Sequence, residues 1–210
     1  MSPLIIRDLR LSDYQETWQK MREFTDNRDD KTMDELWLLE HPAVFTQGLA
    51  GKAEHILDAH AIPIVHTDRG GQVTYHGPGQ LVAYPLFDLK RKNLHARALV
   101  RTLENSVIAL LKHYNITAVS RCDAPGVYVN GEKICSIGLR IRKNCSYHGI
   151  ALNVDMDLTP FQYINPCGYQ NMKMTQIKAF SPPITINDVK KQLVFRITKN
   201  FGYNLSKASA

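Results

Sequence analysis

Cys167 stands in a segment whose residue types suit a nucleophile. The run Asn165-Pro166-Cys167-Gly168-Tyr169 follows neither helical nor strand periodicity. Pro166 restricts the backbone that enters Cys167, and Gly168 allows other backbone to come close. Reactive side chains are often carried on such loops above a rigid scaffold. Cys167 is therefore a candidate for nucleophilic catalysis, and a buried, unreactive thiol is the alternative.

A nucleophilic cysteine reacts as its thiolate, so a neighbouring group has to lower its pKa. By context the candidate neighbours are His76, His148 and Lys133. Strand periodicity places Lys133 on the face of Cys135 and Ile141, which is apolar, and burial there would lower the pKa of a lysine. The alternative is an exposed Lys133 beside the preceding turn, with its ammonium in water.

A glycine-rich stretch from Arg69 to Gln80 is the second candidate site. Four of its twelve residues are glycine and one is proline, which lets the backbone approach other groups closely. Its polar members need partners if they are buried; they are Arg69, Gln72, Thr74, Tyr75, His76 and Gln80. We interpret it as a ligand-lining strand–loop–strand, because a simple hairpin turn needs only two to five residues.

Small residues mark a third segment, His148 to Val154. Gly149 and Ala151 share one strand face and would leave room for something to lie against it. A substrate or a closely packed helix would explain this pattern equally well.

Composition limits the class of protein. The chain has 210 residues, 44% of them hydrophobic, which suits one domain with a large core. Its four cysteines form no C-x-x-C pair, no apolar run approaches the length of a membrane span, and the N-terminal residues turn charged too early for a signal peptide. We therefore expect a cytosolic protein with reduced cysteines. The net charge of +6 fits solubility, nucleic acid or an acidic protein partner, without choosing among them.

Nucleotide binding through a phosphate loop is not indicated. Gly51-Lys52 is the one pair that resembles such a loop, but the pattern also needs glycine at position 46 and serine or threonine at position 53. This chain has Thr46 and Ala53 at those positions.

Helices that could position these residues are predicted in three places. Ser12 is a candidate N-cap for a helix that runs to about Arg28. An amphipathic pattern predicts a second helix over 95–114. Asn187 or Asp188 is the expected cap of a final helix.

Strands are predicted around the candidate residues. Residues 34–40 form an apolar run, and 62–66 and 81–86 flank the glycine-rich stretch. Asn130-Gly131 predicts a hairpin with a type I′ turn. The strand after it alternates through Cys135 to Ile141, and 147–154 is its expected partner.

Several separated motifs together resemble the lipoyl (octanoyl) transferase family, lipoate biosynthesis protein B. The resemblance covers roughly positions 35 to 180 in the family's order. It rests on the segments 69–80, 124–128, 133–138, 148–154 and 166–168.

The resemblance implies an α+β fold, a mixed β-sheet flanked by helices, similar to the catalytic domain of biotin and lipoate ligases. Residues 1–210 would form a single octanoyltransferase domain that uses neither metal nor cofactor. The family's acyl-carrying cysteine falls on Cys167 and its pKa-lowering lysine on Lys133. The family's acyl-binding segments fall on Arg69, Gly70, Gly71, Gln72, Val73, Thr74, Tyr75, His76, Ser136, Ile137, Gly138, Gly149, Ile150 and Ala151.

The activity implied is the first step of endogenous protein lipoylation. An octanoyl group would pass from octanoyl-acyl carrier protein through a Cys167 thioester to the target lysine of lipoyl domains of 2-oxoacid dehydrogenase E2 subunits, or of the glycine-cleavage H protein. Backbone N–H groups near Gly77 or Gly168 would stabilise the oxyanion. Neither nucleic acid nor membrane is then expected as a partner. The alternatives are an ATP-dependent lipoate or biotin ligase on the same scaffold and a nucleic-acid-binding module.

Overall fold

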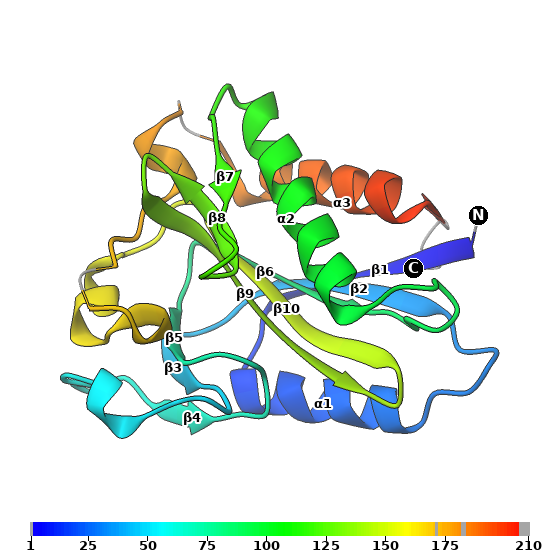
Figure 1. Cartoon of the computed structure of the whole chain (residues 1–210), viewed down its shortest axis with the longest axis horizontal. Coiled ribbons are helices and arrows are strands. Elements are labelled where there is room, and N and C mark those ends of the chain that lie inside the picture. The colour runs from blue at the N-terminus through cyan, green and yellow to red at the C-terminus, as the bar shows by residue number, and fades with distance from the viewer. Residues whose placement is uncertain (1, 171, 182–183, 206–210) are drawn as a thin grey trace.

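The computed structural model describes residues 2–170, 172–181 and 184–205, and its main feature is a strongly twisted mixed sheet (Figure 1). In the described residues this sheet has eight strands in the order β11-β1-β2-β6-β10-β9-β8-β7. Their bounds are β1 Ser2–Leu11, β2 Asp34–Glu40, β6 Gln80–Leu86, β7 Val119–Ser120, β8 Gly126–Val129, β9 Glu132–Arg142, β10 Cys145–Asn153 and β11 Tyr203–Leu205. The expected α+β fold with a mixed sheet is confirmed.

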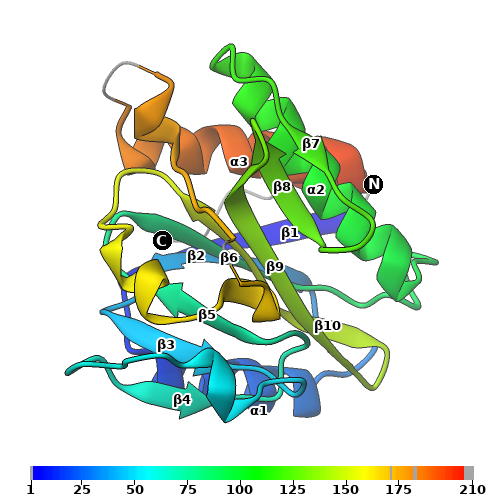
Figure 2. The same ribbon diagram turned by 60° about the vertical axis from the view of Figure 1, so that its left-hand side comes forward.

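A second, three-stranded sheet lies beside the main one (Figure 2). Its order is β4-β3-β5, with bounds β3 Val44–Gln47, β4 Ile64–His66 and β5 Val73–His76. Strand β5 belongs to the glycine-rich stretch, and β6 of the main sheet begins where that stretch ends. The strands predicted over 62–66 and 81–86 are confirmed as β4 and β6, and the glycine-rich stretch between them joins the two sheets.

Helices cover both faces of the main sheet. Helices α2 (Ala96–His113) and α3 (Ile186–Phe201) lie on one face and α1 (Tyr14–Asp26) on the other (Figure 1). The larger core fills the α2–α3 side with residues such as Leu99, Leu103 and Leu193, all fully buried. In the described part of the chain, no helix is long and apolar enough to cross a membrane. Short 3₁₀ turns are η1 Ala53–His55, η2 Thr159–Tyr163, η3 Pro166–Gly168 and η4 Ile177–Ala179.

The predicted helix caps were wrong by one to three residues. Asp13, not Ser12, caps α1 by accepting the N–H of Glu16, because the Ser12 hydroxyl donates to the carbonyl of Leu9. Thr185 caps α3 by accepting the N–H of Asp188. In both places a residue one to three positions from the predicted cap supplies the side-chain oxygen that accepts the N–H at the start of the helix.

Two tight turns set the register of the strands that carry the site. Asn130 and Gly131 have φ of 51° and 85°, so the predicted type I′ hairpin between β8 and β9 is confirmed. Lys143 and Asn144, with φ of 50° and 59°, make a similar turn between β9 and β10. The side chains of β9 and β10 are thereby held in fixed pairs.

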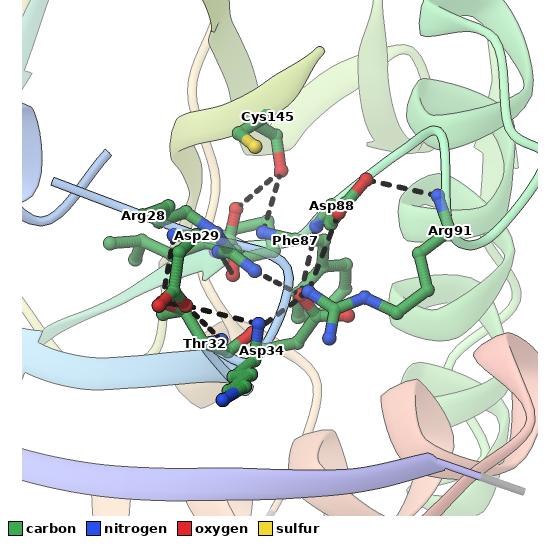
Figure 3. Close-up of polar contacts among 12 residues, drawn as sticks. Arg28, Asp29, Thr32, Asp34, Phe87, Asp88, Arg91 and Cys145 are labelled. Atoms are coloured by element: carbon green, nitrogen blue, oxygen red, sulfur yellow. Dashed lines mark hydrogen bonds and ion pairs between the residues drawn. The ribbon is translucent and has the colours of Figure 1, made fainter. Parts of the chain in front are cut away.

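A buried ion-pair cluster lies next to the first residue of β10, at the opposite end of the strand from its last residue, Asn153 (Figure 3). Asp34 is 1% exposed, accepts a hydrogen bond from Arg28 at 2.5 Å and lies 3.6 Å from Arg91. It also accepts from the Asp88 N–H at 2.8 Å. The cluster joins β2 to the segment between β6 and α2, where Asp88 is bridged to Cys145.

Candidate active site

The Cys167 thiol and the Lys133 ammonium lie side by side. Lys133 Nζ donates to Cys167 Sγ at 3.0 Å. Cys167 is the middle residue of the short 3₁₀ turn η3 and has φ of 57° and ψ of 16°, in the left-handed region. A residue with a side chain holds that conformation only where its surroundings enforce it, at a cost of about 1–3 kcal/mol. The backbone therefore presents this thiol in one fixed direction.

A β-bulge turns Lys133 toward Cys167. Val127 pairs with Cys135 while the next residue, Tyr128, pairs with Lys133, so Ile134 is an extra residue in β9. The predicted placement of Lys133 on the face of Cys135 was therefore wrong, because the bulge reverses the alternation at this point. Lys133 is nevertheless buried, at 1% exposure, which removes the alternative of a solvated side chain.

Neighbouring backbone fixes the Lys133 position on both sides. Its N–H donates to the carbonyl of Lys173 and its carbonyl accepts the N–H of Thr175, both at 2.9 Å. A Cβ on Gly126 would stand 2.8 Å from Lys133 Cε and 2.6 Å from the carbonyl oxygen of Cys135. With φ of 141°, Gly126 is a position that only glycine fills without strain, and its absent side chain makes room for the lysine. The Gly126 N–H is held by Glu104 of α2 at 2.9 Å.

The electrostatics of the pair depend on both partners. Burial alone would lower the pKa of Lys133, but the negative charge and hydrogen bond of Cys167, with a smaller contribution from Tyr128, outweigh burial and raise the pKa above its ordinary value. Lys133 is therefore held as an ammonium beside the Cys167 sulfur.

A cavity of about 530 Å³ opens beside the pair. It brings together the residues predicted from the sequence, with Tyr75 as the exception. Tyr75 instead packs its ring against Phe45 and Phe161. In the residues that the structure describes, no three histidine, cysteine or acidic side chains converge as a metal site would require.

Arg69 is buried in the wall of this cavity. Its guanidinium donates to the carbonyl oxygen of Thr46 at 2.5 Å, to the Thr46 hydroxyl at 2.9 Å and to Gly70 O at 2.9 Å. The Thr46 hydroxyl also meets His76 Nε2 at 3.3 Å, and His76 Nδ1 meets Gln80 at 2.7 Å. These polar residues of the glycine-rich stretch hold one another in place, which is the partnering that their burial requires.

The two histidines considered as partners for Cys167 are engaged elsewhere. His76 bonds to Gln80 and Thr46. His148 Nε2 bonds to the Asp68 carboxylate at 2.9 Å, and burial outweighs that carboxylate and lowers the pKa of His148. Of the three candidate neighbours, Lys133 is the one that the fold brings to the thiol.

The small residues of β9 and β10 serve close packing. A Cβ on Gly138 would stand 3.1 Å from Arg69 Cδ, and one on Gly149 would stand 2.1 Å from the Ala83 carbonyl oxygen. Both glycines are cavity-lining, but their missing side chains are explained by neighbouring protein atoms. Ala151, which pairs with Ser136, packs among apolar residues including Val82.

Of the two expected oxyanion donors, Gly168 has its N–H engaged in this conformation and Gly77 does not line the cavity. The Gly168 N–H donates to the carbonyl of Asn165 at 2.9 Å. Gly77 is not among the cavity-lining residues of the described chain. The positive group beside the reacting sulfur is instead the side chain of Lys133, and the charge of Arg69 in the cavity wall also acts on Cys167.

Sequence reasoning missed part of the cavity wall. Tyr14 of α1 and both Val82 and Tyr84 of β6 line it, as does the segment before β8 with Ala124 and Pro125. Ala124 and Pro125 belong to a motif that the resemblance used without assigning it a role. Tyr14, Val82 and Tyr84 lie in ordinary apolar patterns, which carry no sign of a site.

A cluster of buried histidines predicts acid sensitivity of the fold. His41 is fully buried, which lowers its pKa to about 4, and burial also lowers the pKa of His76 and His148. Each binds a proton more weakly when folded than when unfolded. The contribution of these neutral histidines to the free energy of unfolding is therefore fully present above about pH 6.5 and is lost as the pH falls toward 4. We expect His41 alone to remove about 2 kcal/mol of unfolding free energy between pH 7.5 and pH 5.

Urea unfolding followed by circular dichroism at pH 7.5, 6 and 5 measures this effect. His41→Asn should flatten the pH dependence, and the exposed His60 provides the control, since His60→Asn should leave the slope as it is. An unfolding free energy that stays constant over this range would contradict the prediction.

Comparison with known proteins places these features in a family. The model of the lipoyl protein ligase A/B catalytic domain matches residues 13–198. The chain is 60% identical over 200 residues to the octanoyltransferase of Vibrio vulnificus strain YJ016, covering 95% of this chain and 92% of that protein. It is 56% identical over 201 residues to the octanoyltransferase of Vibrio atlanticus strain LGP32, covering 96% and 92%.

Solved structures share the fold at low identity. The bi-partite lipoate protein ligase of Thermoplasma acidophilum superposes with a TM-score of 0.80 at 15% identity, covering 99% of this chain and 87% of that one. The biotin protein ligase of Aquifex aeolicus gives 0.58 at 14% identity, covering 96% and 69%. The expected similarity to the catalytic domains of lipoate and biotin ligases is confirmed. The chain belongs to the lipoyl protein ligase A/B catalytic domain family.

Proposed function

We propose that this chain is an octanoyltransferase in which residues 1–210 act as one catalytic domain and Cys167 carries the acyl group. It moves an octanoyl group from octanoyl-acyl carrier protein to the target lysine of a lipoyl domain. The observation that supports this mechanism best is the contact between the buried Lys133 and the half-buried Cys167, 3.0 Å apart, beside a cavity of about 530 Å³. The relatives named octanoyltransferase support the choice of acyl group.

In the first half-reaction the Cys167 thiolate attacks the thioester carbonyl of the donor. The new S–C bond forms, and the negative charge that develops on the carbonyl oxygen is stabilised by the cationic groups of Lys133 and Arg69. The C–S bond to the pantetheine arm then breaks. The departing thiolate takes a proton from Lys133, which leaves a neutral amine beside an uncharged Cys167 thioester.

The second half-reaction uses that neutral amine. Once Cys167 is acylated, the charge that raises the pKa of Lys133 is gone and burial remains to lower it. Lys133 then accepts a proton from the attacking amine of the acceptor lysine as the amide bond forms. Cys167 leaves as a thiolate, and the ion pair is restored.

An ATP-dependent ligase is the second candidate, since lipoate and biotin ligases share the fold. That reaction starts from a free carboxylic acid and does not need a nucleophilic cysteine. The Lys133–Cys167 geometry favours transfer from a thioester, for which no nucleotide is required.

Intact-protein mass spectrometry after mixing with octanoyl-acyl carrier protein, without ATP, tests the proposal. We expect a mass gain of one octanoyl group on the wild type, and loss of that group when a lipoyl domain is added. An unchanged mass with a carrier shown to be loaded would overturn the acyl-enzyme and favour the ligase. The glycine-cleavage H protein, tested in the same way, is the further proposed acceptor.

The donor is an acidic protein, and this chain carries a net charge of +6. We expect kcat/KM with octanoyl-acyl carrier protein to fall about three- to tenfold as NaCl rises from about 0.05 M to about 0.5 M. The uncharged octanoyl-pantetheine thioester serves as the control and should show no such fall. Equal responses of the two donors would exclude electrostatic steering.

The proposed place of action is the cytosol. Cys167 must be a free thiol to attack the donor, and the described structure records all four cysteines as free. A reducing compartment keeps such a thiol available.

A further inference from the structure

The cavity beside Cys167 has an exposed mouth and a buried inner end. Leu49 and Tyr169 at the mouth are 63% and 42% exposed. At the inner end Tyr14, Tyr84 and His148 are at most 3% exposed. An acyl chain attached to Cys167 has its apolar tail inside, so the buried end is where that tail finishes.

Strand register gives distances along the strand that lines the cavity. On β10, Leu152 pairs with Cys135, which is two residues along β9 from Lys133, and His148 pairs with Leu139 four residues farther on. Four strand residues span about 13 Å. The eight bonds from the sulfur to the last carbon of an octanoyl group span about 9 Å at the rise of an extended chain. A tail that starts at the level of Cys135 and runs along β10 therefore ends close to the level of Gly149, one residue short of His148.

Tyr84 lies at that level. The register pairs Ile150 with Ala83, which puts Tyr84 beside Gly149 on the neighbouring strand. The Tyr84 hydroxyl bonds to His41 Nε2 at 2.8 Å, and His41 Nδ1 donates to the Ser12 carbonyl at 2.6 Å. Because His41 is buried and is itself bonded to backbone, these hydrogen bonds hold the Tyr84 ring in the cavity wall.

His148 makes the end polar. Its ring packs against Tyr84 with centroids 6.2 Å apart, and Nε2 is held by Asp68. Its Nδ1 is buried and has no hydrogen-bond partner in the described residues. A longer tail would have to push the Tyr84 or His148 ring away from the hydrogen bonds to His41 and Asp68, and losing buried hydrogen bonds is unfavourable.

We propose that Tyr84 and His148 form a polar stop that limits the bound acyl chain to about eight carbons. Each methylene buried before the stop strengthens binding about fourfold. Beyond it, a further methylene meets the Tyr84 ring or the His148 ring and gains nothing. This inference rests on the proposed acyl-enzyme and adds to it the residues that choose the chain length.

Competition between chain lengths tests the stop. Wild type and Tyr84→Ala are mixed with equal amounts of hexanoyl-, octanoyl-, decanoyl- and dodecanoyl-pantetheine, and the acyl groups on Cys167 are counted by mass. We expect Tyr84→Ala to raise the decanoyl-to-octanoyl ratio about tenfold or more, as two newly accommodated methylenes imply. Phe87→Ala is the matched control, because Phe87 is fully buried in the core on the α2–α3 side and its loss should leave the ratio unchanged. A ratio that does not move in Tyr84→Ala, or moves equally in Phe87→Ala, overturns the proposal.

A second variant works in the opposite direction and does not depend on Tyr84→Ala folding. Ala151 lines the cavity between Cys167 and the stop, so Ala151→Val should shorten the space and raise the hexanoyl-to-octanoyl ratio about fourfold. An unchanged ratio there also counts against the stop. Wild type that gains no acyl group of any length would instead refute the acyl-enzyme itself, so the two failures are distinguishable.

Discussion

Replacing Cys167 with serine abolishes octanoyl transfer, with an expected loss on the order of 10⁴-fold or more. The hydroxyl of serine is far less acidic than a thiol, so Lys133 has no anion to pair with and no nucleophile to stabilise. The variant should keep its fold, since it only exchanges a sulfur atom for a smaller oxygen atom in a half-buried loop residue. Transfer is measured as octanoylation of a lipoyl domain and acylation as the mass of the enzyme.

The other three cysteines provide the controls. Cys135 is fully buried, which raises its pKa to about 12, and burial also raises the pKa of Cys145. Cys122 is exposed and stands outside the cavity. Serine at any of these three positions should retain transfer. If transfer survived in Cys167→Ser and vanished in one of the three, the assignment of the nucleophile would be wrong.

Much of the fold was predictable because periodicity and turn chemistry report local structure directly. The apolar run at 34–40, the amphipathic helix at 95–114 and the Asn130-Gly131 hairpin are all present. Strand β1 (Ser2–Leu11) was missed, since its charged residues interrupt the apolar alternation and its pairing with β2 and β11 joins segments distant in the sequence. Such pairing leaves no local signal.

The site was predictable in composition but not in geometry. The residue types at positions such as Gly126 and Cys167 can be read from the sequence. The bulge at Ile134, which turns the Lys133 side chain toward Cys167, cannot. Periodicity assumes regular alternation, so one extra residue reversed the predicted face. Tyr84 likewise looked like any strand residue, because its place at the end of the cavity depends on the register of β6 against β10.

Replacing Lys133 with arginine separates the two half-reactions. Arginine keeps a positive charge beside Cys167, so acylation by octanoyl-acyl carrier protein should persist. It should be slower, because arginine cannot give a proton to the departing thiolate and its larger side chain lies close to Gly126. Arginine does not lose its proton in proteins, so it cannot accept one from the acceptor lysine. We expect transfer to the lipoyl domain to fall by about 10²- to 10⁴-fold while the octanoyl enzyme accumulates.

Two further variants make this result decisive. Lys133→Met removes the charge as well as the base and should lose acylation and transfer together. Lys173→Arg makes the same exchange at an exposed lysine whose carbonyl accepts the Lys133 N–H, and it should retain both activities. Transfer at the wild-type rate in Lys133→Arg would exclude proton acceptance by this residue. Its role would then be limited to holding the thiolate, and the base for the second half-reaction would have to come from the acceptor protein or from water.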